Sequence, residues 1–95
     1  MLYQFDMPIG KDEATRFAAD VVDRDIALRA WVRAPVTCVH KDSDGVRVEE
    51  NHVVVDFLVR CLADARDIHL LIDRHYQKLS EMVGDDRIVT VIVSD

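Results

Sequence analysis

One cysteine and two histidines are the residues of this chain whose types and spacing could bind a metal. Cys38 and His40 are separated by one residue, so on a β-strand their side chains share a face. After a tight turn, His52 or Glu50 would come near them on the partner strand. Because sulfur and imidazole ligands suit copper or zinc, the pattern predicts a metal site at Cys38, His40 and His52. Packing and surface polar contacts are the alternative, since only two of these ligands have a spacing that compels proximity.

Acidic residues around the same turn offer a second candidate, a site for a hard cation. They lack the ligand spacing and the glycine of a calcium loop, and a solvated acidic tip is the better explanation. The four residues are Asp42, Asp44, Glu49 and Glu50.

Motifs typical of catalysis are missing from the sequence. Its three glycines, Gly10, Gly45 and Gly84, form no phosphate-binding loop. Neither cysteine and no serine stands in a nucleophile motif. We therefore expect a protein that is not an enzyme.

The candidate ligands lie in a predicted β-hairpin around which we expect the fold to be organised. Residues 46–61 contain six valines, which favour a strand, and residues 36–40 form its partner across an Asp-Gly turn. Strict alternation predicts one face made of Val53, Val55, Phe57, Val59 and Cys61. It predicts an opposite face made of His52, Val54, Asp56, Leu58 and Arg60.

The remaining elements follow from hydrophobic periodicity. We expect a strand at 2–7, a helix from residue 11, and a strand returning from residue 26 with an edge or bulge at Pro35. A second helix should run from residue 64 to residue 82, with His75 and Tyr76 in its apolar stripe. A last strand at 87–93 is apolar on both faces, which is typical of a central strand.

This order of elements predicts an α+β, ferredoxin-like βαββαβ fold in a single domain spanning residues 1–95. The sheet would have four antiparallel strands, two helices on one face and a long central hairpin. Because two helices cover only one face, Val54 and Leu58 would remain exposed in a lone subunit. We therefore expect a homo-oligomer that buries them.

Charge and composition narrow the classes of partner. The 95 residues carry a net charge of −6, which argues against nucleic-acid binding. No apolar run is long enough to span a membrane, and the first residues do not resemble a secretion signal. We expect a cytoplasmic protein with reduced cysteines, in which Cys38 and Cys61 are small core residues, the alternatives being a disulfide or a metal site.

The segment from Glu13 to Arg60 resembles the CutA divalent-cation tolerance family. EATRFAADVVDRDIALRAWV is similar to the family's alanine-rich helix and the strand after it, and APVTCVHKDSDGVRVEENHVVVDFLVR is similar to its hairpin. In the second helix, Ile68, Ile72 and His75-Tyr76 resemble an Ile…His-x-Tyr pattern. The sequence departs from the family at Arg29, which replaces a cysteine, and at positions where the family has Ser, Tyr and Trp and this chain has Cys38, His40 and Asp42.

This resemblance implies a homotrimer built by edge pairing of long hairpins, with roles in metal tolerance and copper binding. It also implies a further candidate site at Arg60, His75 and Tyr76. The function we expect is non-enzymatic binding of copper or another divalent metal. The alternative is a small acidic interaction or regulatory module that binds a protein or a small molecule.

Overall fold

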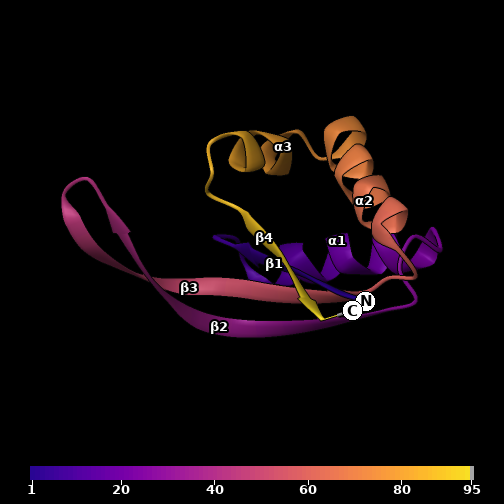
Figure 1. The fold of residues 1–95 in the computed structure, drawn as a ribbon, viewed down its shortest axis with the longest axis horizontal. Helices are drawn as coiled ribbons and strands as arrows, with labels where there is room; N and C mark the ends of the chain where they lie inside the picture. Colours follow the sequence, from indigo (N-terminus) through magenta and orange to yellow (C-terminus); the bar gives the residue numbers. More distant parts are fainter. Residues whose placement is uncertain (95) are drawn as a thin grey trace.

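Within residues 1–94, which the computed structural model describes, one four-stranded antiparallel sheet packs with three helices. The elements in chain order are β1 (Leu2–Met7), α1 (Lys11–Asp23), β2 (Arg29–Asp42), β3 (Gly45–Leu58), α2 (Leu62–His75), α3 (Gln77–Gly84) and β4 (Val89–Ser94). The strands are ordered β2-β3-β1-β4 (Figure 1). The predicted α+β, ferredoxin-like fold is therefore confirmed, with one helix more than expected.

The core lies between the helices and one face of the sheet. Phe5 of β1, Phe17 of α1 and Phe57 of β3 are fully buried, and their rings meet edge to face with centroids 5.5 to 6.0 Å apart. Aromatic pairs favour this geometry. Along β1 and β3 every second residue faces this core, which leaves Asp6 and Asp56 on the open face of the sheet.

The β2–β3 hairpin extends well beyond the rest of the sheet, as Figure 1 shows. β1 pairs only with residues 53–58 of β3, whereas β2 and β3 continue to pair as far as Asp42 and Gly45. Gly45 closes the turn with φ +118°, a conformation that favours glycine. We call residues 36–52, where β1 no longer flanks the hairpin, the arm. The predicted hairpin and its Asp-Gly turn are confirmed.

Two bulges interrupt the hairpin where the arm begins. Between the pairs Arg33↔Val54 and Val36↔His52, β2 advances three residues while β3 advances two. Between Val36↔His52 and Cys38↔Glu49 the surplus residue is on β3, where Asn51 has φ 65°. Each bulge reverses the faces to which the side chains of one strand alternate. Because one surplus residue lies on each strand, the shift in pairing register caused by the first bulge is cancelled by the second. The bulge expected at Pro35 is confirmed, and strict alternation along β3 was wrong.

The second predicted helix is in fact two helices. The backbone leaves the helical conformation at Tyr76 (φ −131°, ψ 71°), whose ring packs edge-on against Phe17 with centroids 5.2 Å apart. Leu79 and Met82 are buried after the break. The apolar spacing of the sequence therefore continues across the break and does not reveal it. His75, expected in the apolar stripe, is the exposed last residue of α2. None of the helices in residues 1–94 combines the length and hydropathy of a membrane span.

Three expectations about strands were also wrong. β4 is an edge strand rather than a central one, so its apolar character marks uncovered surface. β2 begins at Arg29 rather than near residue 26, because Asp25 (φ 61°) turns the chain first. β3 ends at Leu58, and Cys61 is the exposed N-cap of α2.

The apolar surface left uncovered differs from the predicted one. We expected Val54 and Leu58 to be exposed to solvent in a lone subunit. This was wrong, because Val54 is only 7% exposed and Leu58 is half-buried. Instead, valines of the arm stand out: Val39, Val46 and Val48 are 64%, 72% and 62% exposed. They share the face of the arm opposite Cys38 and Glu49, where no helix reaches them.

The Asn51 bulge can be tested by substitution. Asn51→Val should lower the free energy of unfolding by about 1–2 kcal/mol, because a β-branched side chain resists positive φ, whereas Asn51→Gly should stay within a few tenths. Urea denaturation measures both. Glu50→Val is the matched control at the neighbouring position, and it should leave stability nearly unchanged. Equal stability of Asn51→Val and the wild type would contradict the bulge.

Candidate metal centre

Three neighbouring strands each bring one metal-binding side chain to the open face of the sheet. Asp6 of β1, Cys38 of β2 and His52 of β3 offer a carboxylate oxygen, a thiol sulfur and an imidazole nitrogen that all lie within 4.8 Å of one another. The bulge near Pro35 is needed for this arrangement, because without its surplus residue Cys38 would face the helix layer. The structure thus joins two of the predicted ligands, Cys38 and His52, and adds Asp6.

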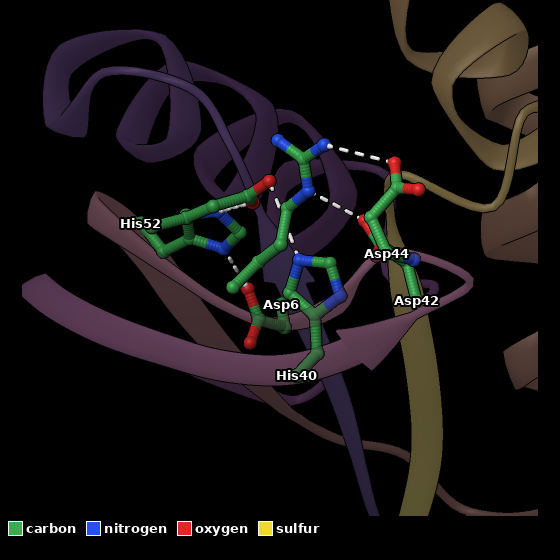
Figure 2. A network of polar contacts seen from close by, with 7 residues as sticks. Asp6, His40, Asp42, Asp44 and His52 are labelled. Carbon is green, nitrogen blue, oxygen red and sulfur yellow. Dashed lines mark hydrogen bonds and ion pairs between the residues drawn. The ribbon is translucent and has the colours of Figure 1, made fainter.

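His52 is buried between two carboxylates. Its Nδ1 lies 2.5 Å from Oδ1 of Asp6 and its Nε2 lies 2.9 Å from Oε2 of Glu49. Figure 2 shows the His52 ring directed at Asp6. A protonated imidazole donates to both carboxylates, whereas a neutral one donates to only one of them.

His40, the third predicted ligand, lies outside this cluster. Its Nε2 is 3.3 Å from Oε1 of Glu49, so Glu49 joins the two imidazoles with its two oxygens. The neighbour across the hairpin was predicted to be His52 or Glu50. The bulge at Asn51 places Glu49 and His52 on one face, three residues apart, and this is why Glu49 takes the position that alternation gave to Glu50.

The contacts within this site shift the pKa values of its own side chains. Burial opposes a charge on His52, but the hydrogen bonds to Asp6 and Glu49 outweigh it and raise the pKa of His52. The same contact with His52, helped by His40, lowers the pKa of Glu49. Burial, followed by the negative charges of Asp6 and Glu49, raises the pKa of the Cys38 thiol. His52 therefore holds its proton more readily than a free imidazole does, and Cys38 holds its proton more readily than a free thiol does.

A groove of about 690 Å³ opens over the cluster. One wall comes from the arm and from the end of β1, and the other comes from the segment that leads from α3 into β4. Its lining combines apolar and charged side chains: Asp6, Pro8, Cys38, His40, Glu49, Glu50, Asn51, His52, Met82, Asp86, Arg87 and Val89.

Two of the four acidic residues at the turn, Asp42 and Asp44, contact the side chain of Arg47. Nε of Arg47 contacts Asp42 at 2.5 Å and its Nη2 lies 3.8 Å from Asp44 (Figure 2). Asp42 also accepts the backbone N–H of Asp44 at 2.7 Å. These contacts support the solvated acidic tip that the sequence favours.

The candidate residues Arg60, His75 and Tyr76 are not brought together into one site. Arg60 donates to Asp25 at 2.8 Å and lies 3.4 Å from Asp64, near the end of α1 and the start of α2. The hydroxyl of Tyr76 donates to Asp20 at 2.7 Å, and burial together with this bond raises its pKa to about 12. These contacts tie elements together, and no hydrogen bond or ion pair in residues 1–94 joins Arg60 to Tyr76.

Sequence reasoning missed the place of two residues at this site, Asp6 of the cluster and Glu49 beside it. Asp6 is 46 positions from His52, so no local spacing connects them. Its one signal was a charge inside an apolar strand, on the face that Gln4 shares. Glu49 was assigned only to the acidic tip, because the positive φ of Asn51 cannot be read from alternation.

Comparison with known proteins connects the fold to one group. No protein-family model matches the chain, and a search of curated proteins finds no match either. Among solved structures, the divalent cation tolerance protein Cut A1 from Thermus thermophilus aligns with a TM-score of 0.64 at 10% identity, over 99% of this chain and 84% of that one. CutA1 from Oryza sativa aligns with a TM-score of 0.61 at 12% identity, over 99% and 79%.

A third similar structure is CutA1 from a psychrotrophic Shewanella species, with a TM-score of 0.61 at 19% identity over 75% of this chain and 64% of that one. The chain also covers 64% of CutA from Synechococcus elongatus, so it spans less than two thirds of the length of these two proteins. At such identities the likeness shows the fold. This chain has the CutA fold, and the resemblance seen in the sequence is confirmed at that level.

The two carboxylates around His52 predict a pH dependence. Since the folded-state pKa of His52 lies above the ordinary 6.5, its contribution to stability is complete below pH 6.5 and is lost as the pH rises through the folded pKa. Glu49→Gln should lower the pKa of His52 in an NMR titration and weaken this loss of stability. The resonances of exposed His75 serve as the internal reference. An unchanged His52 titration in Glu49→Gln would contradict the bond.

Proposed function

We propose that this protein is a CutA-like, oligomeric metal-binding protein that takes up a divalent cation at Asp6, Cys38 and His52 and acts by binding rather than catalysis. The observation that carries the proposal is the convergence of three ligand atoms of different elements within 4.8 Å. The description of the Thermus thermophilus neighbour as a divalent cation tolerance protein supports the same role.

The donor set fits a borderline transition metal. A thiolate, an imidazole and a carboxylate are ligands of zinc and copper, whereas calcium and magnesium require mainly oxygen donors. Nδ1 of His52 faces Asp6 and would take the metal, while Nε2–H would donate to Glu49. A carboxylate in this second position orients a metal-binding histidine and strengthens its binding. His40 in turn holds the second oxygen of Glu49.

Metal uptake at this cluster is an exchange with protons. His52 must lose the proton that its raised pKa favours, and the Cys38 thiol must also ionise. The affinity should therefore rise with pH. A thiol ligand also requires a reducing compartment, so we place the protein in the cytoplasm.

Assembly through the arm is the second part of the proposal. Val39, Val46 and Val48 form an exposed apolar stripe on a ribbon that projects from the subunit. β4 adds Val91 and Val93, which are 43% and 50% exposed, at a free edge of the sheet. An exposed stripe and a free edge on one chain favour pairing between copies, and we propose that the assembly is a homotrimer.

The alternative function, a module that binds a small molecule or a protein, has one observation in its favour. The groove over the cluster has a volume within the range of small-molecule sites and mixes apolar with charged side chains.

Calorimetric titration with zinc tests the metal site. Cys38→Ser and His52→Ala should each weaken binding by at least about tenfold, because each removes a ligand, whereas His75→Ala, which removes an exposed histidine elsewhere, should not change it. Heats measured in two buffers of different ionisation enthalpy should report proton release. Zinc binding that survives both ligand substitutions unchanged would contradict this site.

Light scattering after size exclusion tests the assembly. Val48→Asp should dissociate the oligomer while the helical circular dichroism persists, since the change places a charge in the proposed interface and outside the core. Leu70→Asp replaces an exposed apolar residue on α2 and should leave the oligomer intact. A monomeric wild type at micromolar concentration would refute the proposed assembly.

A further inference from the structure

We infer that the metal is held together with a small chelating molecule, an α-amino acid with an apolar side chain, that occupies the groove over Asp6, Cys38 and His52. This inference rests on the proposed metal site and adds a second ligand class to it. The juxtaposition that carries it is an incomplete set of ligands on the floor of a mixed groove.

Within residues 1–94 the cluster supplies three ligands, and all three line the groove. Zinc and copper take four or more ligands, and a site with three protein ligands leaves a position for an external one. Glu49, the nearest further carboxylate, already bonds to both His40 and His52. A metal held by these three residues would lie at the floor of a groove of about 690 Å³. This space is larger than a water molecule needs and suits a small organic ligand that would complete the coordination.

The charges on the groove walls select the kind of chelator. Four acids (Asp6, Glu49, Glu50 and Asp86) face the groove, so a polyanion such as a nucleotide would be repelled. A metal-bound amine, by contrast, presents N–H donors to such carboxylates. No ion pair joins Glu50 or Asp86 to another side chain in the described part of the chain, residues 1–94, so both can accept these donors.

Arg87 and three apolar side chains of the groove suit the carboxylate and the side chain of an amino acid. A carboxylate that binds the metal through one oxygen has a second oxygen left, and the guanidinium of Arg87, which pairs with Asp85 at 3.2 Å through one nitrogen, has further donors for it. Pro8, Met82 and Val89 supply the apolar lining. An amine, a carboxylate and an apolar side chain on one carbon are the features of an α-amino acid.

Cobalt(II) is the probe for this inference, because its visible absorption reports the number and type of its ligands. L-leucine added to the cobalt-loaded protein should change the d–d spectrum. Its affinity should be at least about tenfold higher than that of glycine, since the groove adds contacts to the leucine side chain. L-leucine should show no binding to the metal-free protein by calorimetry. Both comparisons use the wild-type chain, so they do not depend on any variant folding.

A substitution in the groove wall separates the two ligands. Val89→Trp fills the groove from β4, at a residue that is 54% exposed, and should keep cobalt affinity within about threefold while L-leucine binding falls at least tenfold. Leu70→Trp on α2 is the matched control and should change neither.

The outcomes distinguish the inference from the function on which it rests. If cobalt does not bind at all, the proposed metal site and the chelator both fall. If cobalt binds but its spectrum ignores L-leucine, or glycine binds as tightly as L-leucine, or L-leucine binds equally well without metal, the metal site stands and the chelator is refuted.

Discussion

The arrangement of the open face depends on a pair of opposed bulges in one β-hairpin. β2 has a surplus residue near Pro35, and β3 has one near Asn51. The two shifts in strand register cancel, but each strand has reversed the faces to which its side chains alternate. Beyond them, Cys38 and Glu49 face the same way as Asp6 and His52, and the valines of the arm face the other way. Backbone geometry thus determines both the ligand cluster and the exposed stripe.

The buried imidazole gives the cluster its chemical character. A histidine held between Asp6 and Glu49 keeps its proton more readily than a free one, and a metal at Nδ1 would replace that proton as the positive charge among the carboxylates. The proposed metal site would therefore be built in advance, since the same carboxylates that stabilise the imidazolium would bind the metal and orient the ring. Metal would then compete with protons, and occupancy of the proposed site would depend on pH.

Much of the fold could be predicted because it follows from local chemistry. The valine density of β3 and the Asp-Gly turn identified the hairpin, and periodicity located α1 and the core residue Phe57. The break at Tyr76 was hidden because a single non-helical residue leaves the apolar spacing intact. Spacing across the hairpin predicted that Cys38 and His52 would lie close together, but Asp6 joins them only through strand pairing. Val54 is buried by neighbours that the sequence does not place.

The thinness of the arm has a thermodynamic consequence. Val39 lies between Cys38 and His40 in the chain, and Val48 precedes Glu49. The exposed apolar stripe and the polar side chains therefore lie on opposite faces of the same short stretch of the hairpin. A neighbouring molecule that clamps one side restricts the torsions available to the other. Linkage is reciprocal. If the proposed subunit contact changes the affinity for the proposed cation by some factor, cation binding would change the affinity between subunits by the same factor.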